Sequence, residues 1–344
     1  MNLNDIPKHF NVDCTMSDYG DGLINNTYVT DDGKHIIQKI NTKVFTNPVG
    51  MIDNIIKVTK HFKKKGIPTL EFLKSEDKYY YIDEENNFWR CSRFIDDTIT
   101  YSAPPNDKCL FYEGQVIGDF HKAMIDFDAS TLCEPIPDFH HTRKRFNRFV
   151  KVLEEDKVGR AKTVKKEIDF ILDRERYADI ILDGMADGTI PVRVTHNDTK
   201  LNNILFNKTT GKPICLIDLD TVMPGSVLYD YSDAIRICAS TAAEDEQDLS
   251  KVNFSLDSFK TFTDGFLSTS ELNERETELL RFSTRLMLFE TAMRFLTDYL
   301  EGDVYFKTSY PEHNLVRTRA HFKLIEDIEA HEKEIQDILD SLLQ

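Results

Sequence analysis

The sequence predicts an α+β protein with two lobes, a small β-rich N-terminal lobe and a large helical C-terminal lobe. Residues 1–95 combine alternating β-branched patterns with turn-forming residues and contain a single amphipathic helix pattern. Residues 96–344 instead show helical periodicity over most of their length. The pattern changes after Asp96 and Asp97, and we therefore expect a hinge over residues 93–97 between the two lobes.

The N-terminal lobe is expected to contain a β-hairpin, a helix and a second strand pair. Strands are predicted over residues 23–30, 35–40, 78–83 and 87–95, and one helix over residues 48–65. Asp31-Asp32-Gly33 has the residues of a hairpin turn, and Gly66-Ile67-Pro68 ends the helix pattern. The composition of this lobe thus favours a small sheet with one helix.

The C-terminal lobe is predicted to be mainly helical. Apolar residues at helical spacing predict helices over residues 111–127, 141–155, 160–182, 271–301 and 317–343. Between the third and fourth of these lies a short strand-rich segment, residues 192–220, which contains the polar motif described below. The chain has no internal repeat and no low-complexity tract.

The composition is typical of a globular protein and argues against several partners. The chain has 344 residues, of which 40% are hydrophobic and 30% charged, with a net charge of -16. Nucleic acids and anionic membranes would be repelled by this charge, so neither is expected as a partner. The six cysteines are scattered without a paired motif, which indicates reduced thiols. Without a signal-like start or a membrane-length apolar run, we expect a cytoplasmic protein.

The most informative motif runs from His196 through Asp198 to Asn203, followed one hydrophobic strand later by Asp218. A catalytic loop for phosphoryl transfer carries a His, a base Asp, an Asn and then a metal-binding Asp in this order and spacing. Either carboxylate alone would be read as an ordinary loop residue. Together they predict a kinase-like fold that uses ATP and Mg²⁺.

Each residue of this motif has an expected role. Asp198 should orient and deprotonate the attacking hydroxyl, and His196 should orient the loop by hydrogen bonds. Asn203 and Asp218 offer the oxygen ligands that Mg²⁺ prefers. Asp220 is either a second metal ligand or a surface carboxylate at the end of a strand, with equal weight for both interpretations.

The nucleotide is expected to contact the N-terminal lobe. Gly20, Gly22 and Asn25 form a short phosphate loop that lacks the third glycine of the usual pattern. Lys39, on the second strand of the hairpin, fits a lysine that holds the α and β phosphates. The helix over residues 48–65 has no Glu to pair with this lysine, and Asp53 is its only acid. Either Asp53 reaches Lys39, or the lysine is held by another group.

The hinge completes the predicted nucleotide site. We assign Arg93, Phe94 and Ile95 to contacts with the nucleotide, because they lie where the two predicted lobes join.

The motif resembles the aminoglycoside phosphotransferase and choline kinase superfamily of small-molecule kinases. A narrower resemblance is to the N-acetylhexosamine 1-kinases, and it extends from about residue 20 to about residue 320. It rests on Gly22-Leu23-Ile24-Asn25, Gln38-Lys39-Ile40-Asn41, Ile136-Pro137-Asp138-Phe139-His140, Asp218-Leu219-Asp220-Thr221-Val222-Met223-Pro224-Gly225 and Arg294-Phe295-Leu296-Thr297-Asp298-Tyr299-Leu300. The resemblance implies phosphorylation of the anomeric hydroxyl of N-acetylglucosamine or N-acetylgalactosamine by ATP and Mg²⁺.

A sugar pocket needs hydrogen-bonding side chains and aromatic faces near the base. Besides Asp198, the candidates are Thr221, Asp233, Arg236, Arg294 and Tyr305. Arg294 lies on an otherwise apolar helix, where a charge is costly to bury without a partner. A structural ion pair with Asp298 one turn later explains Arg294 equally well.

Two alternatives to a sugar kinase remain open. The acidic net charge would attract a cationic substrate such as choline, an aminoglycoside or homoserine. The missing third glycine and helix glutamate slightly favour a kinase-like binding module that has lost its activity, whereas the intact Asp198, Asn203 and Asp218 weigh against it.

Overall fold

The computed structural model describes residues 3–20 and 24–344, which form two compact units. Unit 1 comprises Met1–Ser102, Ala123–Pro137 and Asn202–Pro224, and unit 2 comprises Ala103–Lys122, Asp138–Leu201 and Gly225–Gln344. The sequence placed a single boundary after residue 95, whereas the backbone contacts add two later segments to the N-terminal unit. The division into lobes at residue 95 stays a prediction.

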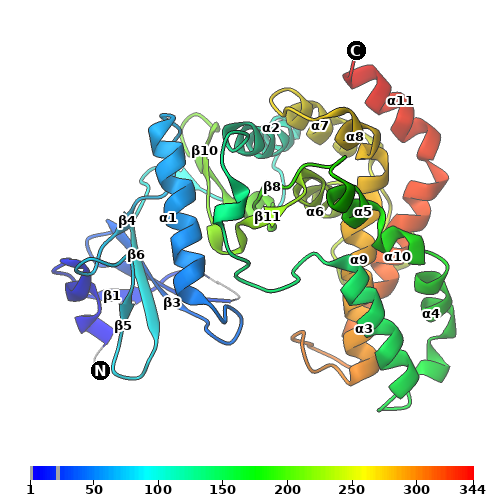
Figure 1. Cartoon of the computed structure of the whole chain (residues 1–344), viewed down its shortest axis with the longest axis horizontal. Coiled ribbons are helices and arrows are strands. Elements are labelled where there is room, and N and C mark those ends of the chain that lie inside the picture. Colours follow the sequence, from blue (N-terminus) through cyan, green and yellow to red (C-terminus); the bar gives the residue numbers. More distant parts are fainter. Residues whose placement is uncertain (1–2, 21–23) are drawn as a thin grey trace. The chain divides into compact units, whose positions relative to one another are not determined.

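Unit 1 is built on an antiparallel sheet with strand order β1-β2-β3-β6-β4, and β5 also pairs with β6 (Figure 1). Its strands are β1 (Met16–Asp18), β2 (Asn26–Thr30), β3 (His35–Ile40), β4 (Phe72–Leu73), β5 (Tyr81–Ile82) and β6 (Phe88–Arg93). The predicted hairpin is thus confirmed as β2 and β3, although β2 begins three positions later than expected. Strands β1 and β4 were not predicted, because each has only two or three residues.

One face of this sheet is covered by the N-terminal segment. The short 3-10 helices η1 (Leu3–Asp5) and η2 (Pro7–Phe10) place Ile6 and Phe10 against Ile37, Trp89 and Cys91. These apolar side chains form the small hydrophobic core of the unit.

Helix α1 (Pro48–Lys64) confirms the helix predicted for the N-terminal lobe. Asn47 caps its first turn, and the buried Asn54 fixes its position within unit 1. The amide of Asn54 donates to the carbonyls of Cys133 and Val222, at 2.8 and 2.9 Å, and accepts from the Cys133 N–H at 3.0 Å. Helix α1 is therefore tied to the segment just after Asp220.

A second, three-stranded sheet of unit 1 has the order β10-β9-β7. Its strands are β7 (Thr98–Ile99), β9 (Ile204–Asn207) and β10 (Pro213–Leu216). The 3-10 turn η7 (Leu219–Thr221) and β11 (Met223–Gly225) follow it along the chain.

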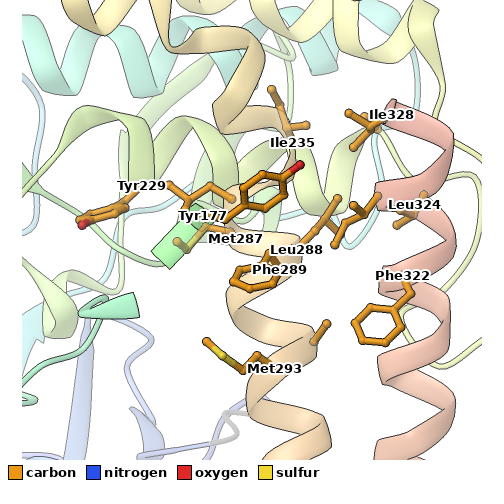
Figure 2. Close-up of a cluster of buried hydrophobic side chains, with 14 of the residues drawn as sticks. Tyr177, Tyr229, Ile235, Met287, Leu288, Phe289, Met293, Phe322, Leu324 and Ile328 are labelled. Carbon is orange, nitrogen blue, oxygen red and sulfur yellow. The ribbon is translucent and has the colours of Figure 1, made fainter. Parts of the chain in front are cut away.

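Unit 2 is helical around one large apolar core. Its long helices are α2 (Asp107–Ala123), α3 (Thr142–Glu155), α6 (Val227–Cys238), α7 (Leu256–Leu267), α9 (Leu280–Glu301), α10 (His313–Ala330) and α11 (Glu332–Leu342). Shorter helices are α4 (Lys165–Leu172), α5 (Ile180–Asp187) and α8 (Glu274–Glu278), and β8 (Arg193–Thr195) precedes the catalytic motif. Figure 2 shows Leu288 and Phe289 of α9 packed beside Leu324 and Ile328 of α10.

Several helix boundaries differ from the sequence prediction. The helix expected over 160–182 is broken into α4, α5 and two 3-10 turns. The helix expected over 271–301 begins at Glu274, where Asn273 and Glu276 form a capping box, and is divided at Leu279 into α8 and α9. Helices α6 and α7 lie in stretches for which no helix was predicted. Within the described ranges, no helix is long and apolar enough to cross a membrane. The α+β class is confirmed.

Candidate active site

The segment after β8 in unit 2 is held by one buried carboxylate. Asp230 of α6 accepts the backbone N–H groups of His196 and Asn197 at 2.8 and 2.7 Å. The ring of His121 lies 2.9 Å from the same carboxylate, and Asp230 is fully buried. Asn197 has a positive φ of 65°, a left-handed conformation that costs energy and that these bonds support. The loop is thus fixed immediately before Asp198.

Asp198 is half-buried and carries an ion pair with a lysine that the sequence interpretation did not single out. Lys200 Nζ lies 2.6 Å from Asp198 Oδ1. Burial alone would lower the pKa of Lys200, but Asp198 and Asp233 outweigh it and raise the pKa. The ring nitrogen Nδ1 of His196 accepts from the Asp198 N–H at 3.3 Å, which agrees with the orienting role predicted for His196.

Asp233 and Arg236 support this loop from α6. Asp233 Oδ2 accepts the Thr199 N–H at 3.3 Å, and Asp233 Oδ1 pairs with Arg236 at 2.9 Å. Burial opposes ionisation of Asp233, but Arg236 and Lys200 hold its pKa below the usual value. Arg236 also pairs with Glu244 at 2.6 Å. Both predicted substrate residues are therefore engaged with protein partners.

The two predicted metal ligands of unit 1 lie at adjacent strand ends. Strand β9 begins directly after Asn203, and β10 ends two residues before Asp218; Ile204 pairs with Leu216 in antiparallel register. The Asn203 carbonyl accepts the Ile217 N–H at 2.8 Å, so the two residues flank one end of the strand pair. Asp218 is exposed and has a φ of 58°, in the left-handed region that aspartate adopts more readily than most residues. An amide and a carboxylate placed in this way fit Mg²⁺.

Asp220 is almost completely buried, and protein donors engage both of its oxygens. Arg90 of β6 donates to Oδ1, and Asn25 donates to Oδ2 at 2.6 Å. Asn25, a predicted nucleotide contact, is thereby joined to the 218–221 segment. The surface carboxylate considered for Asp220 is excluded, since its side chain is 3% exposed.

Lys39 and Asp53 do not meet. Lys39 Nζ lies 5.8 Å from the centre of the Trp89 ring, on the face of the sheet that carries the small core. Asp53 pairs with Lys57 one turn along α1, at 2.7 Å. Of the two alternatives for Lys39, pairing with Asp53 is therefore excluded, because Asp53 is engaged with Lys57.

The remaining predicted nucleotide contacts occupy exposed or half-buried positions in unit 1. Gly20 is exposed with a positive φ of 68°, and Gly22 falls outside the described residues. Arg93 lies 3.4 Å from Glu71, and the Phe94 N–H donates to the Lys34 carbonyl. The Ile95 carbonyl accepts from Thr98 Oγ1 at 2.7 Å. The role of these five residues in nucleotide binding stays a prediction.

Arg294, on α9 of unit 2, is flanked by aromatic rings. Its guanidinium lies 6.0 Å from the centre of the Phe139 ring and 5.5 Å from that of Phe306. The alternative ion pair with Asp298 is not formed. Asp298 instead accepts three backbone N–H groups, from residues 304–306, and the Asn314 amide at 2.8 Å.

These bonds at Asp298 shape the loop that carries Tyr305. Tyr305 is 68% exposed, so its ring is available to a ligand. Thr221, the last predicted substrate residue, is half-buried at the end of η7 and belongs to unit 1.

A second arginine, Arg145 of α3, lies in the same region of unit 2. It donates to the Phe139 carbonyl at 3.0 Å, and its buried Nε has no hydrogen-bond partner in the described part of the chain. Burial, together with the nearby charge of Arg294, lowers the pKa of Arg145. Neither arginine forms an ion pair with a described carboxylate. Arg145 could not be singled out from the sequence, because it lies among other basic residues on an amphipathic helix.

Glu290, whose charge interacts with those of Arg145 and Arg294, already has hydrogen-bond partners. It lies 2.9 Å from His140 Nδ1 and accepts from Thr142 Oγ1 at 2.6 Å. Burial opposes its ionisation, but His140 and Thr142 hold the pKa of Glu290 below its usual value. The adjacent His141 accepts from the Lys144 N–H and caps α3.

Comparison with known proteins agrees with this arrangement. Residues 15–259, more than half of the chain, match the model of the phosphotransferase enzyme family. A microcompartment-associated aminopropanol kinase superposes with a TM-score of 0.67 at 13% identity, covering 96% of this chain and 97% of that chain. The amicoumacin kinase hAmiN in complex with AMP-PNP, Ca²⁺ and Ami gives 0.59 at 12% identity, with 92% and 88% covered.

A third solved structure is a choline/ethanolamine kinase family protein from Mesorhizobium loti. It gives a TM-score of 0.57 at 14% identity, with 93% and 92% of the two chains covered. At these identities the three structures show a shared fold, and the predicted kinase-like fold is confirmed. The match to the family model is a match of the sequence over more than half of the chain. From it we conclude that the chain belongs to the phosphotransferase enzyme family.

Proposed function

We propose that the protein transfers the γ-phosphoryl group of ATP to the anomeric hydroxyl of an N-acetylhexosamine. In this reaction the sugar oxygen attacks the γ-phosphorus, the bond from that phosphorus to the bridging oxygen breaks, and ADP leaves. The proton of the anomeric hydroxyl passes to Asp198. The products are the sugar 1-phosphate and ADP.

The residues of the motif suit these steps. Asp198, held by the loop that Asp230 anchors, would orient the hydroxyl and accept its proton. Lys200, 2.6 Å from Asp198, would keep a positive charge beside the phosphoryl group in transfer. Asn203 and Asp218 would hold Mg²⁺, which neutralises charge on the phosphate oxygens when bound. The nucleotide complex of the amicoumacin kinase, with its Ca²⁺, favours a divalent cation here as well.

The observation that carries the choice of substrate is the arginine pair of unit 2. The Arg294 guanidinium lies near the rings of Phe139 and Phe306, and Arg145 donates to the Phe139 carbonyl; neither arginine forms an ion pair with a carboxylate of the described residues. Two unpaired guanidinium groups attract oxygen acceptors, such as the carbonyl of an N-acetyl group and sugar hydroxyls. The aromatic rings offer faces for the apolar side of a sugar ring.

The same region is unsuited to a cationic substrate. An ammonium group would meet the charges of Arg145 and Arg294 and would find the Glu290 carboxylate bonded to His140 and Thr142. Asp233 is likewise paired with Arg236. A kinase for an amino alcohol, which the aminopropanol and choline/ethanolamine neighbours suggest, is therefore the second candidate.

A substrate screen separates the two candidates. ADP release should be measured over N-acetylglucosamine, N-acetylgalactosamine, glucose, choline, aminopropanol and an aminoglycoside. We expect release with the N-acetylhexosamines and none with the amines. Release with an amine alone would replace this proposal by the second candidate.

The role of Asp198 is tested by Asp198→Ala. Removal of a positioned base should lower turnover by about 10²- to 10⁴-fold. Nucleotide affinity, measured by calorimetry with ADP and Mg²⁺, should stay nearly unchanged. Asp169→Ala, which removes an exposed carboxylate of α4, is the matched control and should retain full turnover. Substantial activity in Asp198→Ala would remove the assignment of this residue.

A further inference from the structure

Two positive side chains of unit 1 lie on opposite faces of the same sheet. In the β3–β6 pair, Lys39 stands opposite Trp89, and Gln38 stands opposite Arg90. Because successive side chains of a strand alternate between faces, Lys39 and Arg90 point in opposite directions. Lys39 shares its face with Trp89 and the N-terminal 3-10 helices. Arg90 shares its face with Asp220.

Hydrogen bonds to Gln38 on one side and to Asp220 on the other hold the Arg90 guanidinium. Its Nε donates to Gln38 Oε1 at 2.9 Å, and Gln38 Nε2 donates to Thr27 Oγ1 at 3.1 Å. On the other side Nη1 donates to Asp220 Oδ1, and Asn25 Nδ2 donates to Asp220 Oδ2 at 2.6 Å. The guanidinium plane is thereby fixed by neighbours from β3 and from η7.

The orientation of the Asn25 amide is determined as well. Asn25 Oδ1 accepts the Asn41 N–H at 2.9 Å, so its nitrogen is the atom that faces Asp220. Both oxygens of Asp220 thus receive a hydrogen bond from the protein. This carboxylate is better suited to orient Arg90 and Asn25 than to serve as a metal ligand.

One nitrogen of the Arg90 guanidinium takes no part in these hydrogen bonds. Nη2 of Arg90 has no hydrogen-bond partner among residues 3–20 and 24–344, although the side chain is only 4% exposed. A buried ion pair is a costly way to gain stability, and its retention is better explained by a requirement for that geometry. A planar, pre-oriented donor with a free N–H is the group that proteins use to bind phosphate oxygens.

The position of Arg90 agrees with such a use. Asn25 comes from the predicted phosphate loop, and Asp220 lies two residues after Asp218, a predicted metal ligand. The Arg90 guanidinium therefore lies where the nucleotide-binding and metal-binding segments of unit 1 meet. The ring of Phe72, 5.8 Å away, covers part of it.

We propose that Arg90, and not Lys39, is the cation of unit 1 that binds the phosphates of the nucleotide, and that Asp220 positions Arg90. The inference uses the phosphotransferase activity of the family and is independent of which acceptor is phosphorylated. Phosphate binding, which the sequence analysis assigned to Lys39 of β3, is thereby assigned to a residue of β6. Lys39 then serves to cover Trp89.

Nucleotide binding in the absence of any acceptor tests this directly. ADP affinity in saturating Mg²⁺ should be measured by calorimetry for Arg90→Met and for Lys39→Met, a matched substitution on the opposite face. Loss of a charge-assisted hydrogen bond should weaken ADP about 10- to 100-fold in Arg90→Met. Lys39→Met should bind ADP within about twofold of the parent protein, as expected for a half-exposed charge. The opposite ranking of the two variants would overturn the proposal.

A second variant, Arg90→Lys, distinguishes loss of phosphate binding from a folding defect caused by Arg90→Met. It keeps a cation for Asp220 but removes the free planar N–H, and its fold is checked by circular dichroism. A folded Arg90→Lys protein with reduced ADP affinity supports the proposal, and one with unchanged affinity contradicts it. Because no sugar is present in these experiments, the measured ADP affinities test the role of Arg90 even if the sugar assignment is wrong.

The Mg²⁺ dependence separates Asp220 from Asp218. In Asp218→Asn the Mg²⁺ concentration needed for half-maximal ADP binding should rise, because a metal ligand is weakened. In Asp220→Asn ADP affinity at saturating Mg²⁺ should fall, and the half-maximal Mg²⁺ concentration should stay within about twofold of the parent value. An equal rise in both variants would show that Asp220 binds the metal, and the positioning role would be wrong.

Discussion

Asp230 illustrates how a single side chain can set the geometry of a loop that carries a proposed catalytic residue. Its two oxygens accept the N–H groups of His196 and Asn197, and no water is needed to satisfy either donor. This role could not be predicted from the sequence, since it depends on the packing of α6 against the loop.

We predict that Asp230→Asn impairs both stability and turnover. An amide has one oxygen, so one of the two buried N–H groups loses its acceptor, at a cost of about 1–3 kcal/mol. The resulting shift of Asp198 should lower kcat about 100-fold, with ADP affinity retained. Urea unfolding and steady-state kinetics measure the two effects. Normal kcat in a destabilised protein would mean that the loop does not depend on Asp230.

The site was only partly predictable at the level of single residues. Spacing singled out Asp198, Asn203 and Asp218 as candidates, because the expected chemistry requires these types in a fixed order, and their roles stay predictions. Spacing gave no reason to single out Arg90 or Arg145, since their surroundings depend on the face of the strand or helix on which they lie. Our proposal of Arg90 in place of Lys39 depends on the same feature, because a shift of one residue along a strand reverses the face.

His321 provides a pH-sensitive contribution to stability. It is buried on α10 with Arg317, Arg236 and Glu244 around it, and burial lowers the pKa of its imidazole from 6.5 to about 4. The unfolded chain therefore binds a proton between about pH 6.5 and pH 4 that the folded protein does not. Stability contributed by the neutral ring is present above the unfolded pKa and is lost as the pH falls through this window.

We predict that His321 alone lowers the free energy of unfolding by about 2 kcal/mol when the pH falls from 7 to 5. His321→Gln, whose amide can still donate to the Arg317 carbonyl, should remove that part of the pH dependence. Urea unfolding of both proteins at the two pH values gives the difference. Equal pH dependence in both proteins would contradict the assignment.

Among the elements, α2 and α7 approach so closely that glycine is required on both. A Cβ on Gly265 would lie 2.0 Å from the Phe111 carbonyl oxygen, and a Cβ on Gly114 would lie 2.0 Å from the Phe262 carbonyl oxygen. Backbone thus meets backbone in the core of unit 2. No helix was predicted over the residues of α7, where Gly265 interrupts the pattern that identifies helices.

Gly265→Ala should therefore lower the free energy of unfolding by about 3 kcal/mol, since two helix backbones must separate. Lys260→Ala, at an exposed position of the same helix, is the control and should change stability by less than about 0.5 kcal/mol. Thermal or urea unfolding measures both. A Gly265→Ala protein as stable as the control would mean that the two helices can part without cost.

Long, regular elements were predicted well, and short or interrupted ones were not. The hairpin and α1 were found from period and turn residues alone. The capping box at Asn273 sets the start of α8, and the break between α8 and α9 lies at Leu279, within a pattern that predicted one helix. Strands β1 and β4 form because they pair with β2 and β6, and the local sequence pattern does not predict such pairing.

For the whole molecule, the net charge of -16 implies that nucleotide binding depends on the metal. A free nucleotide polyanion is repelled, whereas its Mg²⁺ complex carries less charge. We predict that Mg²⁺ and ADP together, at about a hundred times Kd, stabilise the protein by about 2.7 kcal/mol, which raises Tm by about 5 °C. Without Mg²⁺, or in Asp218→Ala, the shift should be small. An equal shift in EDTA would show that the metal is not part of the site.

The central claim is that this member of the phosphotransferase enzyme family phosphorylates an N-acetylhexosamine on its anomeric oxygen. The most direct measurement is the ³¹P and ¹H NMR spectrum of the product formed from ATP, Mg²⁺ and N-acetylglucosamine or N-acetylgalactosamine. We predict one phosphate monoester whose phosphorus couples to the anomeric proton. A phosphate on any other hydroxyl, or product formed only when choline or an aminoglycoside replaces the sugar, would contradict the claim.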